Sequence, residues 1–301
     1  MLRKGLYKAF GINVRTSQFS IRSGAIQEKR KEIEMKILVT GARGFVGARI
    51  MDEWNEAIPA PSLRGANEDA IRQLLDTVDP DVIIHTAAIS DIPACEKNPD
   101  ASYQANVEIP VWLAKTGVKL VAFSTDQVYS GCNDEGPYRE EAAEPANLYA
   151  RHKLEMERRT LEANPNTVLL RATWMYDMPI YRIANRGNFL VNMLRNKELS
   201  FSSTQHRAVT YVREVAYHIM EAASLPGGVY NYGSENEFTM MDTALWLKKT
   251  LSLPIMIHDA GLLHNLWMDC SRIKNNGIHF NSTLDGLREC MEDYGLCEIS
   301  R

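Results

Sequence analysis

The chain has 301 residues, of which 45% are hydrophobic and 24% charged, and a formal net charge of −4. This length is sufficient for a large core, and this charge gives no reason to expect nucleic acid or an anionic membrane as a partner. No apolar run is long enough to span a bilayer, and five scattered cysteines without a C-x-x-C pair indicate reduced thiols in a cytoplasmic protein rather than disulfides or a zinc site.

Residues 1–34 differ in composition from the rest of the chain. Residues 1–27 contain five Lys or Arg side chains and no acid, and a charged run follows at 28–32. An Arg-rich, acid-poor leader is typical of an organellar transit peptide, but a disordered or artefactual extension is the simpler interpretation. We therefore expect a folded domain that begins at Met35.

Residues 35–47, MKILVTGARGFVG, predict a buried strand, a glycine turn and the start of a helix. Gly41 permits a tight turn, Gly44 lets a pyrophosphate approach the backbone, and Gly47 lets the helix pack close to the strand. The free N–H groups of the first helical turn then face the anion. An ordinary strand-to-helix turn is the alternative, but this context favours a dinucleotide site formed by Gly41, Arg43, Gly44, Phe45, Val46 and Gly47.

The second strand has to come from residues 57–62, where two prolines indicate an edge strand or a bulge. No acid stands at 61–64, about 20 residues past the first glycine, where an acid would hold the ribose of NAD. Arg64 and Arg43 could instead pair with a 2′-phosphate, unless both are solvated surface arginines. We therefore expect NADP in preference to NAD.

Strands and helices alternate through the rest of the first half. We expect helices at 69–78 and 100–117, the second bent at Pro110, and buried strands at 81–85 and 119–125. Ala87 and Ala88 follow the strand at 81–85, at the end where a cofactor would lie. Such alternation is typical of βαβ units and predicts an α/β fold with a Rossmann-like, doubly wound parallel sheet.

The second half continues the alternation less regularly. We expect strands at 167–174, 228–232 and 254–258, and helices at 148–163, 189–196, 212–223, 239–251 and 282–294. The last two helices begin with capping boxes. These elements predict a Rossmann domain at 35–174 and a smaller, mainly substrate-binding lobe at 175–301 that is interleaved with the sheet.

Tyr149 and Lys153 are four residues apart in the predicted helix at 148–163, so they share one face. A phenol has a pKa of about 10, and a nearby ammonium group lowers that pKa toward neutrality. The pair alone could equally be a solvated helix face. Thr125 ends a buried strand, where loops place catalytic groups, and its hydroxyl could donate to a substrate carbonyl.

Four segments, TGARGFVG, DVIIHTAAIS, FSTDQVYSG and LYARHKLEMER, occur in the order seen in the extended short-chain dehydrogenases/reductases. Within that superfamily the chain resembles the dTDP-4-dehydrorhamnose reductase family, from Met35 to about Tyr294. The resemblance implies a catalytic group of Thr125, Tyr149 and Lys153. It also implies that Asn106 supports the lysine side at the cofactor. Trp174 would face the sugar, and Asn188 and Arg207 would contact the nucleotide diphosphate.

A purely structural or surface role remains the alternative for several of these residues. Trp174 could be a core aromatic and Arg207 a surface arginine, since both are common. His85 and His206 are expected to be hydrogen-bonded structural histidines, and no spacing of His, Cys and acids suggests a metal site.

The resemblance implies an NAD(P)H-dependent reductase of a keto group on a nucleotide-linked sugar, with Tyr149 as proton donor, and is compatible with a homodimer. Gln127 stands where related dehydratases carry a glutamate, which argues against a dehydratase. One alternative is a nucleotide-sugar epimerase that keeps its NAD. The other is a catalytically idle NAD(P)-binding subunit, like the regulatory subunit of methionine adenosyltransferase within the same family.

Overall fold

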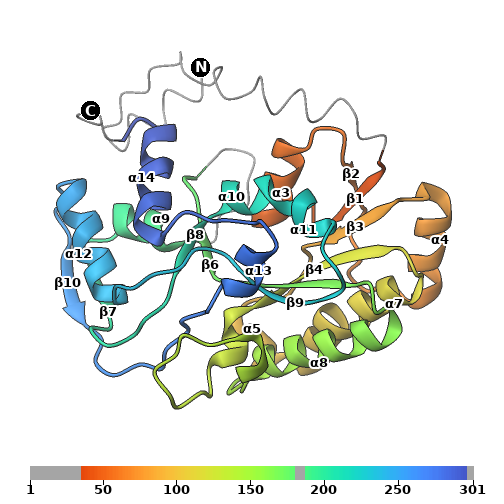
Figure 1. Cartoon of the computed structure of the whole chain (residues 1–301), viewed down its shortest axis with the longest axis horizontal. Helices are drawn as coiled ribbons and strands as arrows, with labels where there is room; N and C mark the ends of the chain where they lie inside the picture. The colour runs from red at the N-terminus through yellow and green to blue at the C-terminus, as the bar shows by residue number, and fades with distance from the viewer. Residues whose placement is uncertain (1–34, 180–186, 297–301) are drawn as a thin grey trace.

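The structure, a computed structural model, describes residues 35–179 and 187–296, so the extension predicted at 1–34 lies outside it. A six-stranded parallel sheet in the order β2-β1-β3-β4-β5-β9 crosses the molecule, with helices on both faces (Figure 1). The predicted Rossmann-like, doubly wound sheet is confirmed.

The strands are short and almost entirely buried, as expected for a parallel sheet that is covered on both faces. They are β1 (Ile37–Thr40), β2 (Ile58–Pro59), β3 (Val82–His85), β4 (Lys119–Thr125), β5 (Val168–Ala172) and β9 (Gly228–Tyr232). β2 is an edge strand of two residues, because prolines cannot donate to a ladder. The chain runs from β1 to β2 and back to β3 on the other side of β1, so the topological switch point lies between β1 and β3.

Two sets of helices cover the sheet. One face is covered by α4 (Glu68–Val78), α7 (Ile109–Lys115) and α8 (Leu148–Ala163). The other is covered by α3 (Phe45–Glu53), α10 (Val212–Tyr217), α11 (Ile219–Ala223) and α13 (Ser271–Asn275). Each set buries the alternate residues of the strands that point toward it, which gives the molecule one apolar cluster on each side of the sheet.

Three predicted elements are divided in the structure. The helix predicted at 100–117 is α6 (Pro99–Tyr103), a π-helical segment (Gln104–Glu108) and α7, with Pro110 in the first turn of α7 rather than at a bend. Proline is tolerated there because the first N–H groups of a helix have no partner. The strand predicted at 167–174 is β5 and β6 (Trp174–Tyr176), which belong to different sheets, and the helix at 212–223 is α10 and α11.

The remaining elements form a smaller lobe beside the sheet (Figure 1). β6 pairs with β8 (Val209–Tyr211), and β7 (Glu198–Phe201) pairs with β10 (Met256–Asp259). The helices of the lobe are α9 (Phe189–Arg195), α12 (Met240–Thr250) and α14 (Thr283–Asp293). Thr239 and Ser282 cap α12 and α14, which confirms both predicted helix starts.

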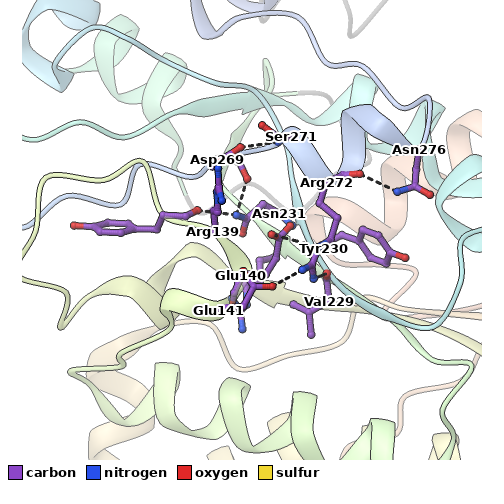
Figure 2. Close-up of polar contacts among 12 residues, drawn as sticks. Arg139, Glu140, Glu141, Val229, Tyr230, Asn231, Asp269, Ser271, Arg272 and Asn276 are labelled. Carbon is purple, nitrogen blue, oxygen red and sulfur yellow. Dashed lines mark hydrogen bonds and ion pairs between the residues drawn. The ribbon is translucent and has the colours of Figure 1, made fainter.

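A polar network ties two loops to the last strand of the sheet (Figure 2). Asn231 of β9 donates its side-chain amide to the carbonyls of Tyr138 and Asp269, at 2.9 Å each, and its backbone N–H to Glu140. Arg272 of α13 lies 3.6 Å from the carboxylate of Glu140. The loop that follows β4 and the segment that leads into α13 are therefore fixed to β9.

No helix within the described ranges is long and apolar enough to cross a membrane.

Glu214 of α10 makes the stability of this fold dependent on pH. Burial raises the pKa of Glu214 to about 7, although the N–H groups of Asn281 partly offset the effect. Because the folded state holds this proton more tightly than the unfolded chain, its contribution to stability is complete below about pH 4.5 and is lost as the pH rises through about 7. The melting temperature, measured at several pH values across this range, should change less with pH in Glu214→Gln than in the wild type. An equal change with pH in both proteins would contradict the assignment.

Candidate functional site

The glycine turn after β1 lies against the loop after β3. Gly41 has a φ of +68°, and a Cβ on it would lie 2.7 Å from the backbone nitrogen of Ala87. A Cβ on Gly47 would lie 2.3 Å from the carbonyl oxygen of Gly41. Only glycine is accommodated at these two positions, which is the tight turn and close helix packing that the sequence predicts.

Helix α3 begins at this turn without a side-chain cap. Its N-cap is Gly44, and its first turn holds no acid. Asn67, Asn147, Thr239 and Ser282, in contrast, cap their own helices with side-chain oxygens. The N–H groups at the start of α3, from Phe45, Val46 and Gly47, have no intrahelical partner. They offer an anion site at the topological switch point, so these residues fit the pyrophosphate of a dinucleotide.

The two arginines predicted to select NADP are both exposed. Arg43 lies in the glycine turn, and Arg64 follows β2. Within residues 35–179 and 187–296, neither side chain makes a hydrogen bond or an ion pair. Both remain free to bind a phosphate, and the cofactor contact of each stays a prediction.

Helix α8 brings the predicted catalytic residues together at the end of β4. The phenol of Tyr149 lies beside the hydroxyl of Thr125, close enough for that hydroxyl to act on its pKa. One turn further along the helix, Lys153 donates from Nζ to the carbonyl oxygen of Phe123, at 2.6 Å. Tyr149, Lys153 and Thr125 are all buried. The face predicted from the four-residue spacing therefore lies against the sheet rather than in solvent.

The electrostatics of Tyr149 differ from the prediction. Burial raises the pKa of Tyr149, the nearby hydroxyl of Thr125 opposes this, and the carboxylate of Asp126 acts in the same direction as burial. Lys153 donates to a backbone carbonyl instead, and burial lowers its own pKa to about 8. The prediction that Lys153 lowers the pKa of Tyr149 is therefore wrong for this structure. The phenol is protonated at neutral pH, which is the form that can donate a proton.

Glu157, which the sequence interpretation missed, continues the same face of α8. It is 3% exposed, and its Oε1 accepts from the hydroxyl of Ser124 at 2.5 Å. Arg171 of β5 donates to both of its carboxylate oxygens, at 2.9 and 2.6 Å. The sequence does indicate this position, because Glu157 lies four residues after Lys153, as Lys153 lies four residues after Tyr149. All three therefore share one face of the helix.

Polar side chains form a row across the sheet near the carboxyl ends of its strands. Thr40 pairs in register with His85, Ser124 with Arg171, and Arg171 with Asn231. All five are buried. Helix α8 lies on this row at Glu157, whose carboxylate meets Ser124 and Arg171.

Asn106 lies in the π-helical segment, a distortion that is frequent at functional sites. Its Oδ1 accepts from the N–H of Ile89 at 3.1 Å, and its Nδ2 donates to the carbonyl of Ile89 at 2.9 Å. Asn106 thereby holds the loop after β3, which contains Ala87 and Ala88, in place. Direct contact between these three residues and a cofactor stays a prediction.

Arg207 connects the lobe to the loop after β4. Its Nε and Nη2 donate to the two carboxylate oxygens of Asp126, at 2.9 and 3.3 Å, and its guanidinium lies 5.4 Å from the ring centre of Trp174. Asp126 is buried and directly follows Thr125. Arg207 is therefore not a free surface arginine, and the half-buried Trp174 belongs to this cluster.

The side-chain hydrogen bonds of Asn188 go to the backbone and not to the cluster of Arg207, Asp126 and Trp174. Its Oδ1 accepts from the N–H of Val191 at 3.0 Å, which caps α9, and its Nδ2 donates to the carbonyl of Asp177 at 2.8 Å. The backbone thus occupies both ends of its amide, and its predicted contact with a diphosphate stays a prediction.

The two histidines have structural partners. His85 shares a hydrogen bond of 2.7 Å between its Nδ1 and the hydroxyl of Thr40, and burial beside Lys153 lowers its pKa to about 3. His206 is stacked on Trp267, with ring centres 4.9 Å apart. No group of His, Cys, Asp and Glu that could hold a metal ion occurs in the part of the chain that the structure describes.

Comparisons with known proteins agree with this architecture. Methionine adenosyltransferase 2 subunit beta from Bos taurus is 27% identical over 289 residues, which cover 84% of this chain and 86% of that protein. Two solved structures share the fold. A dTDP-4-dehydrorhamnose reductase from Bacillus anthracis in complex with NADP is 22% identical, with a TM-score of 0.76 over 87% of this chain and 100% of that one.

A UDP-glucose 4-epimerase from Thermotoga maritima with UDP-glucose is 20% identical, with a TM-score of 0.71 over 87% of this chain and 98% of that one. The family model described as the RmlD substrate binding domain matches residues 35–254. This match extends over most of the described residues, from the glycine turn through α8 and into the lobe. The chain therefore belongs to the RmlD substrate binding domain family.

Proposed function

We propose that this chain is an NAD(P)H-dependent reductase of a 4-keto group on a nucleotide-linked sugar, with Tyr149 as the proton donor. The observation that carries the proposal is the position of the buried Tyr149 phenol beside Thr125 at the carboxyl end of β4, one helical turn from Lys153, which is fixed to β4 through the carbonyl of Phe123. The same edge of the sheet carries the uncapped start of α3, which suits a phosphate. A proton donor and a dinucleotide site on one edge support a reductase.

The residues at this edge have complementary roles in the proposed reaction. A bound nicotinamide supplies the hydride. Tyr149 keeps its proton at neutral pH because burial raises its pKa, and it donates this proton to the oxygen of the keto group as the alcohol forms. Thr125 donates a hydrogen bond to the same oxygen. Lys153 is proposed to bind the ribose of the cofactor, and solvent returns the proton to the phenolate.

The cofactor is proposed to be NADP(H) rather than NAD(H). The glycine turn and the first turn of α3 would hold the pyrophosphate, while Arg43 and Arg64 are exposed and free of partners among the described residues. No acid stands at 61–64, where one would bind an unmodified ribose. The B. anthracis reductase with the same fold was solved with NADP, which supports this choice.

The substrate is proposed to lie against Trp174 and Arg207. The indole offers an apolar face to a sugar ring. The guanidinium has two of its nitrogens on Asp126, which leaves Nη1 for a diphosphate oxygen. Asn188 would take part only through a rearrangement of its cap, so we assign it the weaker role.

A second candidate is a catalytically idle, cofactor-binding subunit of another enzyme. The similarity to methionine adenosyltransferase 2 subunit beta over most of both chains favours it. The two candidates differ in one outcome. A wild-type protein that binds NADPH tightly and turns over no member of a broad panel of 4-keto nucleotide sugars would favour the subunit.

The cofactor proposal predicts the effect of two single substitutions. Arg43→Ala and Arg64→Ala should each weaken NADPH binding about tenfold, because a hydrogen bond to a charged group contributes about 1.5 kcal/mol or more. NADH binding should not change. Titration by nucleotide fluorescence measures both, with Arg72→Ala on exposed helix α4 as the control. A clear preference of the wild type for NADH would refute the proposal.

Tyr149→Phe and Lys153→Met should separate chemistry from binding. Tyr149→Phe removes the proton donor but keeps the ring, so turnover should fall about 10²–10⁴-fold while the Kd for NADPH is nearly unchanged. Lys153→Met should lower both turnover and NADPH affinity. Absorbance of NADPH with 4-keto nucleotide sugars follows the first quantity, and fluorescence titration the second. Near-wild-type turnover in Tyr149→Phe would show that the assigned mechanism is wrong.

A further inference from the structure

Three side chains of α8 meet three consecutive residues of β4. The phenol of Tyr149 lies beside the hydroxyl of Thr125. Lys153 and Glu157 bind the two residues that precede Thr125, through the carbonyl of Phe123 and the hydroxyl of Ser124. Because the three helix residues are four apart, they lie in one line along the helix. A shift of α8 along β4 would break all three contacts together.

Of these three residues, Glu157 is the one anchored on further strands. Its partner Arg171 also donates from Nη1 to the hydroxyl of Tyr129 at 2.9 Å and to the carbonyl of Glu140 at 2.6 Å. The hydroxyl of Tyr129 in turn donates to Asn231 of β9 at 2.6 Å. Glu157 therefore connects α8 to β4, β5 and, through Arg171 and Tyr129, to Asn231 of β9.

We propose that Glu157 is a positioning residue for the catalytic set: it holds α8 in register with β4 and supplies the buried negative charge beside Lys153. The inference depends on the proposed reductase function only for its effect on turnover. The effects of Glu157 on the position of α8 and on the charge of Lys153 do not depend on which reaction the chain catalyses.

Among the groups that face Lys153, Glu157 is the main source of negative charge. His85 approaches from β3 and is neutral, and Cys95 approaches from α5 (Ile92–Lys97). The segment after β4 contributes Asp126, which acts on the phenol rather than on the lysine. Burial alone lowers the pKa of Lys153, and Glu157 is the first of the groups that oppose this.

Loss of this charge should therefore make Lys153 easier to deprotonate. An opposite charge at close range shifts a pKa by about 1–3 units. In Glu157→Gln the pKa of Lys153 should fall by about one unit or more, since the positive charge of Arg171 is also left unmatched. Lys153 would then be largely neutral at about pH 7.5, and a neutral lysine binds an anionic cofactor less well.

The test measures Lys153 directly. Full-length protein with ¹³C-labelled lysine side chains is titrated by NMR, and the Lys153 signal is identified by its absence in Lys153→Met. Glu157→Gln should move its midpoint down by at least about one pH unit, lower NADPH affinity about tenfold near pH 7.5, and recover much of that affinity near pH 6. Glu162→Gln, an exposed glutamate on the same helix, is the matched control and should change neither quantity.

A double variant keeps the test decisive if Glu157→Gln does not fold. Replacement of a buried ion pair by apolar residues of similar volume is often neutral for stability. Glu157→Met/Arg171→Met should therefore fold, yet Lys153 should still titrate at a lower pH than in the wild type, though less so than in the single variant. A Lys153 midpoint that matches the wild type in either folded variant would overturn the proposal.

The outcome for turnover separates this inference from the reductase proposal. If the Lys153 midpoint shifts as expected while the wild type reduces no nucleotide sugar, the role of Glu157 stands and the reductase proposal fails. If the wild type is active and Glu157→Gln keeps both the midpoint and the pH profile of turnover, the role of Glu157 is refuted and the reductase proposal stands.

Discussion

The site depends on one buried ion pair, between Glu157 of α8 and Arg171 of β5. Loss of one partner from such a pair costs about 3–5 kcal/mol, because the remaining charge has neither water nor a counter-charge. The pair therefore holds the helix to the sheet at one position. Tyr149 and Lys153 share that face of the helix, so the geometry of the proposed catalytic set follows from a contact that would take no part in the proposed reaction.

The features that the sequence predicted well are those with a local cause. Glycines that permit a positive φ or a close approach define the turn after β1, and prolines define β2 as an edge strand. The pattern of buried strands, each followed by a helix, similarly predicts the parallel sheet. The division of 167–174 into β5 and β6 was missed, because an apolar run does not show which neighbouring strand each residue will meet.

The features that were missed depend on contacts between residues far apart in the chain. The spacing of Tyr149 and Lys153 shows that they share a face, but not that Lys153 binds the carbonyl of Phe123 on β4. Likewise, the ion pair of Arg207 with Asp126 joins residues 81 positions apart. A glutamate in a helix is usually solvated, so no prediction was made for Glu157 although its spacing indicated the buried face.

The arrangement at this edge of the sheet is compatible with both a reductase and a binding subunit. The two functions differ in one step, the transfer of hydride to a substrate carbon. Single-turnover reactions with NADPH deuterated at the transferred position, followed by mass spectrometry of a panel of 4-keto nucleotide sugars, test this step directly. The account predicts an alcohol that carries one deuterium from the cofactor. Tight binding of NADPH with no deuterium in any sugar would contradict it.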